Sequence, residues 1–489
     1  MAGNVQAQTV QIPPRIPLPS GPHNRGQDTT KDAKLVNCYI ERLPDGTVTV
    51  KKRPGMLLNA SYGPGTASTG NGCFTDKQYN TYAVFGTNLY GLGGVLQAGL
   101  VNQYFTFAEI IANTLTVFLN SGAVVGSLIS TAWTHNAALG TWNAVVAYPA
   151  QATIGSAYLD NYMYVGSNAT PVDLEIPTIF ASSINDPTSW PGGNSIIPQI
   201  ESDLMVFLAK QQSFVIAFKQ FSIELFYDNA GVPVPIAPYS AAKKNIGLAS
   251  PYSVQNIDGT LVFMSTSLAG EYEVHMLDNI NLTKISDKYV EKLLDGALAS
   301  TDPTVRNIMS WWHKDEGHTF YVITSTVKNV TLAYDFDEKS WSQWTDVNGN
   351  YMPICGSTFL QSVRQTLLQH ATNGKMYQFD TDYTNDDGAA IVADIVFDNF
   401  DGGTRRKKTV NQLELLYDVT PGAQIWIRNN DKDFKSTAWT PWRQYDMSQD
   451  SLILTDEGDF RRRAYQFRMP SDAGFRILGL EIQVDIGTS

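Results

Sequence analysis

A pair of short strand-like runs separated by polar turns recurs along the middle of the chain, and this repeat limits the fold more than any other feature. Each copy alternates apolar and polar residues, as expected for half-buried β-strands. Six copies can be recognised, at residues 80–94, 161–176, 213–228, 258–278, 318–337 and 367–380. Their second strands are spaced by about 85, 50, 50, 60 and 45 residues, and repeats near 50 residues are typical of the blades of a β-propeller.

The first of these intervals is longer than the others by about 30 residues, which is too long for one such repeat. The surplus lies at residues 94–147. We interpret it as an insertion between blades that projects as a loop or hairpin from one face. The repeat therefore predicts a six-bladed propeller over residues 59–385, with an insertion near 94–147.

The sequence pattern on either side of the repeat is different. Residues 1–58 begin with a stretch rich in proline and glutamine and continue into a predicted hairpin with its turn at 44–46. We expect an extended N-terminal arm here, and we expect this segment to pack with the C-terminal domain. Residues 386–489 hold longer alternating strands, which predict an antiparallel β-sandwich. One helix is expected, over 286–299 with Ser286 as its N-cap, and the predicted fold class is all-β.

Composition and charge exclude several classes of protein. Only 17% of the 489 residues are charged and the formal net charge is −12, which disfavours a protein that grips DNA by neutralising phosphates. Such a charge suits a wall past which nucleic acid slides without sticking. The N-terminus lacks the pattern of a secretory leader, and no apolar run is long enough for a membrane span. Three cysteines without CxxC spacing predict buried free thiols in a protein made in a cytoplasm: Cys38, Cys73 and Cys355.

The motifs of common enzyme and metal sites are absent or incomplete. No HExxH or GxSxG sequence occurs. Gly65 and Gly70 have the spacing of a phosphate loop, but Asn71 stands where that loop needs a lysine. His313 and His318 lack a third metal ligand nearby, and we interpret them as exposed turn residues.

The acidic run at residues 380–388 resembles a calcium loop at first sight. It lacks the glycine and the glutamate that such a loop requires, so we interpret it as a solvated linker. With these motifs excluded, the sequence predicts no catalytic residue, no bound metal, no cofactor and no enzymatic activity.

Basic residues gather at two places in the C-terminal part of this acidic chain. They are Arg405, Arg406, Lys407 and Lys408, and then Arg461, Arg462 and Arg463. Three interpretations stay open for them: a solvated strand face, an interface with another subunit or partner, and a contact with DNA. We treat the seven residues as a candidate interface.

Two tryptophans, Trp341 and Trp344, follow a strand-like run at 331–336 and an acidic turn. Residues three apart on an extended strand point to opposite faces. We therefore expect one ring to pack between blades and the other to lie nearer the edge. The stretch is interpreted as part of a repeat, and the rings as packing residues that do not grip a ligand.

Several short segments occur in a fixed order. They are VNCY at 36–39 leading to RPG at 53–55, ASSINDPTSWP at 181–191, FK at 218–219 followed by SIE at 222–224, and GLASPYSVQNIDGTLVF at 247–263. The region 331–344 and an arginine-rich sandwich ending in LGLEIQV complete the set. This ordered set resembles the tail hub or nozzle proteins of short-tailed bacteriophages, also called packaged-DNA stabilisation proteins. The resemblance covers most of residues 35–489.

The resemblance implies a structural protein of the virion tail. Proteins of this kind form a homo-hexameric ring below the portal and its adaptor (head-completion) protein. The ring retains packaged DNA and conducts it during ejection. The resemblance also implies contact with tail fibre or tailspike proteins, and with genomic DNA that passes through the channel without sequence-specific binding. The protein would be made in the host bacterial cytoplasm.

Two other classes stay open at this stage. A carbohydrate-binding or carbohydrate-active β-propeller would hold an aromatic pair such as Trp311 and Trp312 in an exposed cleft beside carboxylates. A propeller that serves only as a scaffold for protein partners differs from a tail hub through the resemblance alone.

Overall fold

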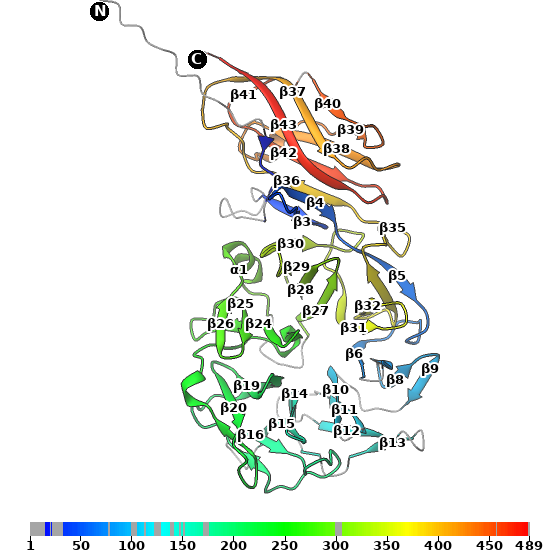
Figure 1. The fold of residues 1–489 in the computed structure, drawn as a ribbon, viewed down its shortest axis with the longest axis vertical. Coiled ribbons are helices and arrows are strands. Elements are labelled where there is room, and N and C mark those ends of the chain that lie inside the picture. The colour runs from blue at the N-terminus through cyan, green and yellow to red at the C-terminus, as the bar shows by residue number, and fades with distance from the viewer. Residues whose placement is uncertain are drawn as a thin grey trace, which may run out of the picture. The chain divides into compact units, whose positions relative to one another are not determined.

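The computed structural model describes residues 15–19, 21, 33–76, 79–98, 105–111, 114–121, 129–136, 141–145, 148–149, 152–169, 176–298, 306–455 and 457–487. This part of the chain is built of β-strands, three 3₁₀ turns and one short α-helix (Figure 1). Contacts divide the chain into two units. The first unit comprises residues 1–56, 333–350 and 381–489, and the second comprises 57–332 and 351–380.

The second unit begins with four antiparallel groups of strands, in each of which a strand pairs with the next one along the chain; the third and fourth groups are joined into one eight-stranded sheet. Their strands are β6 (Gly70–Thr75), β7 (Thr81–Phe85), β8 (Asn88–Gly91) and β9 (Gly94–Gln97); β10 (Phe105–Ile111), β11 (Thr114–Ser121), β12 (Ile129–Asn136) and β13 (Thr141–Ala144); β14 (Ala152–Leu159), β15 (Tyr162–Ala169), β16 (Ile176–Ala181) and β17 (Ser195–Ile196); and β18 (Met205–Gln211), β19 (Phe214–Lys219), β20 (Ile223–Asp228) and β21 (Ile236–Pro238). Short turns between the strands favour this order.

The remaining strands of the second unit form further antiparallel groups. They are β22 (Gly247–Leu248), β23 (Gln255–Ile257), β24 (Thr260–Thr266), β25 (Tyr272–Asp278) and β26 (Asn281–Lys284); β27 (Ile308–Asp315), β28 (His318–Ser325) and β29 (Val330–Asp335); and β31 (Ile354–Leu360), β32 (Gln365–His370) and β33 (Met376–Asp380). In the first of these groups, β24 pairs with both β22 and β23. Two strands contain a boundary between the units, namely β29 and β5 (Gly55–Asn59). The 3₁₀ turns η2 (Ser240–Ala242) and η3 (Pro251–Ser253) lie in connections.

Strands of neighbouring sheets contact one another in a closed cycle. β6 contacts β10, β10 contacts β14, and β14 pairs with β18 in parallel. β19 contacts β22, β23 contacts β27, and β27 contacts β31, which in turn contacts β6. A closed cycle of small antiparallel sheets, none of which can bury both faces alone, is the architecture of a β-propeller. The predicted all-β propeller is confirmed.

The segment 94–147, which we predicted to be an insertion, contains the four-stranded sheet β10–β13. Its pairing is regular, with Phe107 opposite Phe118 and Val117 opposite Trp133. The sheet takes a place in the cycle between β6 and β14. The described strands of the cycle thus fall into seven successive groups, one more than the six copies recognised from spacing. The long first interval holds two repeats.

The first unit is a sandwich of two sheets. One sheet has the order β3 (Cys38–Arg42), β4 (Val48–Lys52), β43 (Arg476–Ile486), β37 (Lys408–Tyr417) and β40 (Leu452–Leu454), with β1 (Arg15–Ile16) on β43 and β41 (Asp459–Phe460) on β37. The other has the order β30 (Ser340–Trp344), β2 (Lys34–Val36), β36 (Ala393–Val396), β42 (Ala464–Met469), β38 (Gln424–Asn430) and β39 (Arg443–Asp446). The short strands β34 (Asn385–Asp386) and β35 (Ala389–Ala390) and the turn η4 (Ser436–Ala438) complete the unit.

Apolar side chains from both sheets form one core in this sandwich. They include Ile40, Val50, Leu413 and Leu480 from the first sheet and Ile395, Ile427 and Phe467 from the second. Alternation along each strand places these residues on the inner faces. N-terminal strands also belong to both sheets: β4 pairs with β43, and β2 pairs with β36.

The predicted helix is present but shorter than expected. It is α1, Lys288–Leu294, and its cap is Asp287, whose carboxylate accepts a 2.9 Å hydrogen bond from the Val290 N–H. Ser286, the predicted cap, donates to Glu291 Oε1 at 3.1 Å. No helix within the described residues is both long and apolar enough to cross a membrane.

Both tryptophans of β30 are buried, so the prediction that one ring lies nearer the edge is wrong. Trp341 is 3% exposed and Trp344 is fully buried. The reason is that β30 is not an edge strand, because β2 pairs with it in parallel through Val36 and Gln343. Trp341 packs 5.0 Å from the ring of Tyr334.

Candidate functional site

The first unit brings the two predicted basic segments together. Lys408 pairs with Phe460 across β37 and β41, and Arg463 forms a bridge with Phe400. A guanidinium Nη1 of Arg461 donates to the carbonyl oxygen of Arg405 at 2.9 Å. We call residues 405–408 and 461–463 the basic cluster.

Lys408 lies beneath the cluster and not on its surface. Its side chain is fully buried, and its three donors meet the carbonyl oxygens of Thr404, Arg406 and Arg461 at 2.7, 3.0 and 2.9 Å. An ammonium group has three protons, so these contacts account for all of them. Burial lowers the pKa of Lys408. Lys408 ties the two segments to each other and is not available to a partner, which corrects its assignment to the interface.

Arg463 has a similar buried role. It is 3% exposed and makes a two-pronged ion pair with Asp431, at 2.7 and 2.9 Å. Its Nη1 also donates to the carbonyl oxygen of Glu457 at 2.7 Å. Its guanidinium lies 4.7 Å from the centre of the Phe460 ring, and the Lys408 ammonium lies 5.2 Å from the same ring. Arg463 therefore supports the cluster from below.

The other five basic residues are exposed: Arg405, Arg406, Lys407, Arg461 and Arg462. Lys407 pairs with Asp459 at 2.5 Å, and Arg462 lies 3.6 Å from Asp433. No ion pair between described residues involves the remaining three arginines. The surface of the cluster thus presents three guanidinium groups that have no carboxylate partner among the described residues.

A second set of residues, from the VNCY and RPG segments, forms a buried network in the same unit. Arg53 is 1% exposed and donates to Asn37 Oδ1 at 3.0 Å, to the Thr345 carbonyl oxygen at 2.9 Å and to both oxygens of Asp386, at 3.1 and 2.6 Å. Its Nη1 also donates to the Pro54 carbonyl oxygen at 2.8 Å. A buried guanidinium needs this degree of satisfaction. The network therefore holds three distant parts of the chain together.

The residue types in these segments follow from the network. Asn37 has a φ of +54°, a left-handed conformation that asparagine tolerates better than most residues. Its side-chain amide donates to Thr345 Oγ1 at 2.7 Å and to the Val392 carbonyl oxygen at 2.8 Å. A Cβ on Gly55 would lie 2.3 Å from the carbonyl oxygen of Asn385, so no other residue fits there.

We predicted that the acidic run at 380–388 is a solvated linker, and this is wrong for part of the run. Asp386 within it is 6% exposed and carries the ion pair with Arg53. Sequence reasoning missed this partner because it lies 333 positions away along the chain. The RPG segment itself was the available signal, since an arginine before a Pro-Gly pair has no evident local partner.

The FK and SIE segments form a buried charged group in the second unit. The Lys219 ammonium is fully buried and lies 2.9 Å from Glu224 Oε1 and 3.2 Å from Asp203 Oδ1. Asp203 also accepts hydrogen bonds from the Phe221 N–H and the Ser222 hydroxyl, at 2.7 and 2.9 Å. These contacts stabilise the turn between β19 and β20, so the segments have a structural role.

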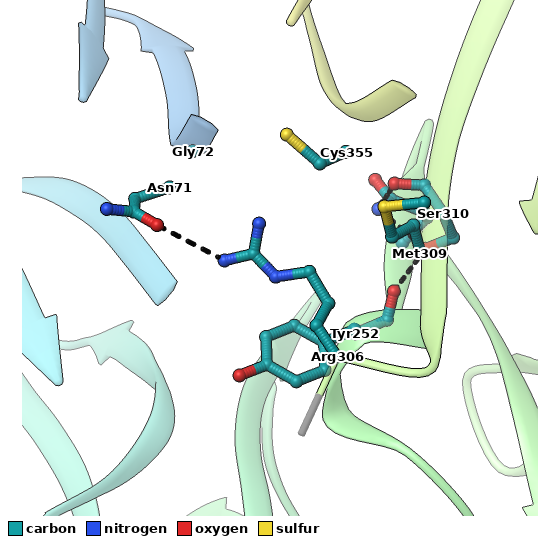
Figure 2. A pocket seen from close by; sticks show the side chains of 8 residues that line it. Asn71, Gly72, Tyr252, Arg306, Met309, Ser310 and Cys355 are labelled. Atoms are coloured by element: carbon teal, nitrogen blue, oxygen red, sulfur yellow. Dashed lines mark hydrogen bonds between the residues drawn. The ribbon is translucent and has the colours of Figure 1, made fainter. Parts of the chain in front are cut away.

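A small pocket in the second unit surrounds Arg306 (Figure 2). The Arg306 guanidinium donates to the Gly70 carbonyl oxygen at 2.5 Å and to Asn71 Oδ1 at 3.5 Å, and it lies 5.1 Å from the Tyr252 ring. The Tyr252 carbonyl oxygen accepts a 2.8 Å hydrogen bond from the hydroxyl of Ser310. The free space is about 20 Å³, which suits one water molecule and no substrate. We assign the pocket a packing role.

The two close histidines are buried, not exposed as we predicted. His313 is 1% exposed and His318 is 5% exposed, on the paired strands β27 and β28. The ring of His313 packs 4.7 Å from that of Phe379, and its Nδ1 lies 2.9 Å from Thr366 Oγ1. Neighbouring sheets cover both faces of a propeller sheet, which explains the burial. Burial lowers the pKa of His313 to about 4.

The part of the chain that the structure describes contains neither a metal site nor the exposed Trp311–Trp312 pair expected for carbohydrate binding. No group of three or more His, Cys, Asp or Glu side chains there could hold a metal ion. The cysteines are free thiols, with Cys38 buried and Cys73 and Cys355 half-buried. Trp311 is fully buried and Trp312 half-buried, so these two do not form the exposed aromatic pair that a carbohydrate-binding propeller would need.

Comparison with known proteins gives one strong match. The family model described as "Bacteriophage P22 Gp10, beta-propeller" matches residues 16–384. No curated protein matches the chain. Among solved structures, a chain of the mitotic checkpoint complex is 10% identical, with a TM-score of 0.39 and coverage of 77% of this chain and 98% of that chain. The extracellular domain of a one-component system from B. thetaiotaomicron is 9% identical, with a TM-score of 0.42 and coverage of 80% and 47%. Both similarities are too low to support an argument.

The family match spans the whole second unit and most of the N-terminal part of the first. It includes the four short segments, from Val36 to Phe263, that carried the resemblance in the sequence. The family is one of phage structural proteins and is not an enzyme class. The chain therefore belongs to the phage-stabilisation family of the bacteriophage P22 Gp10 β-propeller, as a structural protein of a phage virion.

Proposed function

We propose that six copies of this protein form a ring-shaped hub or nozzle in the virion tail, which retains packaged DNA and conducts it during ejection. The observation that carries the proposal is the family match over residues 16–384. The chain would be made in the host bacterial cytoplasm and would then join the tail.

The charge of the chain supports this role. A net charge of −12 on each copy would give the ring a strongly negative potential, which repels the phosphates of DNA. A channel that bound DNA through many lysines and arginines would gain a large affinity for it and would slow its passage. An acidic channel lets the duplex pass with little friction.

We also propose three partners for the ring. It would dock on the adaptor protein below the portal, hold tail fibre or tailspike proteins, and contact genomic DNA without reading its sequence. Each contact is an expectation from the family and from the charge of the chain.

Labelling of intact virions tests the location of the protein. Antibodies raised against the purified chain should decorate the tail in cryo-electron micrographs. Label on the capsid shell, or no label on purified virions, would contradict the proposal.

Particles assembled without this protein test the retention of DNA. They should package DNA and then lose it, so the DNA content of each nuclease-treated particle should fall well below that of the wild type. Heads that stay full would exclude a role in retention.

A further inference from the structure

We infer that the basic cluster docks on acidic side chains of a second copy of this chain, as one half of a head-to-tail subunit interface. This inference rests on the proposed ring and names the residues on one side of the subunit contact. Three observations carry it: the rigid support of the cluster, the guanidinium groups that have no carboxylate partner among the described residues, and the charge of the rest of the chain.

The cluster is rigid before any partner arrives. Buried Lys408 binds carbonyl oxygens on both segments, and buried Arg463 binds Asp431 and the carbonyl oxygen of Glu457. The backbone that carries the exposed arginines is thereby fixed by side chains that solvent does not reach. A surface that is already ordered loses less entropy on binding, which is expected of an interface and not required of a solvated loop.

The exposed groups of the cluster suit carboxylates better than a DNA backbone. Asp459, Asp433 and Asp431 already pair with Lys407, Arg462 and Arg463, so three of the seven positive charges of the cluster are neutralised locally. The charges that remain release fewer counterions than all seven would, which weakens the attraction of the cluster to a polyanion.

The three arginines that remain have planar forks, each of which can hold one carboxylate by two hydrogen bonds. They are Arg405, Arg406 and Arg461. Short-range pairing with individual carboxylates therefore fits the cluster best.

The charge of the chain indicates which partner the cluster binds. Seven of the 35 lysines and arginines lie in the cluster, and the others are far outnumbered by 47 aspartates and glutamates. Another copy of the chain is therefore a ready source of carboxylates. Cluster-to-cluster contact would place like charges together, which costs several kcal/mol, so the contact joins unlike surfaces. Contacts between unlike surfaces build rings when the rotation closes.

Charge reversal at the cluster tests the inference. The variant R405E/R406E/R461E should raise the dissociation constant between copies by about 100-fold or more in sedimentation velocity. The matched control is K339E/K432E/K435E, which reverses three exposed lysines of the same unit and should change that constant by less than about 3-fold. Far-UV circular dichroism and an unchanged thermal midpoint show that both variants fold.

Cross-linking identifies the other half of the interface. R405K and R461K each keep the charge and supply a primary amine, which a zero-length carbodiimide couples only to a carboxylate in direct contact. In a mixture of ¹⁴N- and ¹⁵N-labelled copies, we expect a coupled peptide that joins position 405 or 461 to an Asp or Glu of the other isotope. Couplings found only within one copy would overturn the inference.

The outcomes separate this inference from the proposed function. If R405E/R406E/R461E forms the same oligomer as the wild type, the docking role is overturned and the proposed ring is not. Absence of virion-tail label overturns the ring itself, whatever the variants do. A chain that stays monomeric at every concentration overturns the docking role. A cluster variant that loses binding to a short DNA duplex, while it still assembles, identifies a DNA contact in its place.

Discussion

At the scale of single residues, two of the short segments that mark the family place a buried, paired cation in the fold. Arg53 donates to five acceptors, and Lys219 lies within reach of two carboxylates. The sequence shows that an arginine or lysine stands in such a segment. It cannot show the partner, because Asp386 lies 333 positions from Arg53. Only folding brings these groups together.

Removal of the Arg53 side chain should destabilise the first unit by about 3–5 kcal/mol, because Arg53→Ala leaves the buried Asp386 carboxylate without its cation. Urea denaturation followed by tryptophan fluorescence measures the loss. The control is Arg42→Ala, which removes a half-exposed arginine paired with Glu338 at 2.9 Å and should cost about 1 kcal/mol or less. Equal losses in the two variants would argue against the buried network.

The buried His313 makes stability depend on pH. Its pKa falls from 6.5 to about 4 on folding, so between these values the unfolded chain binds a proton that the folded chain does not. Stability should therefore fall as the pH drops from 6.5 towards 4. In His313→Gln, the slope of unfolding free energy against pH should decrease by up to about 1.4 kcal/mol per pH unit in this window.

Urea titrations at several pH values check this slope. His370 has a similarly lowered pKa of about 4, so His313→Gln should keep part of the pH dependence and the double variant with His370→Gln should lose more. Identical slopes in wild type and both variants would contradict the assignment.

At the scale of elements, alternation and turn chemistry predicted the strands, but not how completely each strand is covered. Trp341 and Trp344 point to different sides of β30, and both are buried because strands and sheets cover both sides. We predicted His313 at an exposed turn because the sequence around it is polar. The residues that bury it, Thr366 and Phe379, lie elsewhere in the chain. Burial depends on neighbours that local pattern does not contain.

Both tryptophans of β30 should therefore be essential for stability. Trp341→Ala and Trp344→Ala should each destabilise the fold by about 3–5 kcal/mol, because each leaves a large cavity in a packed region. Denaturation midpoints at constant m-value measure the loss. Trp312→Ala, at a half-buried position, serves as the comparison and should cost less. A small loss of stability in Trp341→Ala with a large loss in Trp344→Ala would instead support the prediction that one of the two rings lies nearer the edge.

The number of sheets was missed for a related reason. The repeat was counted from prominent second strands, and the interval between the first two was taken as one repeat with an insertion. The structure places β10–β13 in that interval, in regular antiparallel register. The pairing of these strands, which spacing does not reveal, identifies them as a further sheet of the cycle.

At the scale of the whole molecule, the net charge of −12 has a direct consequence for DNA binding. The purified wild-type protein should show no measurable binding to a short DNA duplex at about 10 µM protein and physiological salt, since the negative net charge repels the phosphates and the few unpaired cations release few counterions. Fluorescence anisotropy of a labelled duplex measures this. Micromolar affinity that weakens steeply with salt would contradict a channel that lets DNA slide.

The basic cluster was visible in the sequence as two charged segments, and the structure divides its members by role. Lys408 and Arg463 are buried supports, and the other five residues form the surface. Sequence cannot make this division, because it depends on distant acceptors such as Asp431 and on the ring of Phe460. The structure brings the two segments together, and their role as an interface stays a prediction.

The first unit is closed by strands from opposite ends of the described chain. Arg15 pairs with Glu481, and Val50 pairs with Ile477. During translation, β1 and β4 therefore emerge more than four hundred codons before their partner strand β43. Until residues near Ile486 have left the ribosome, the sandwich lacks a central strand. A nascent or prematurely terminated chain therefore cannot complete the unit that bears the basic cluster, which restricts assembly to chains translated at least that far.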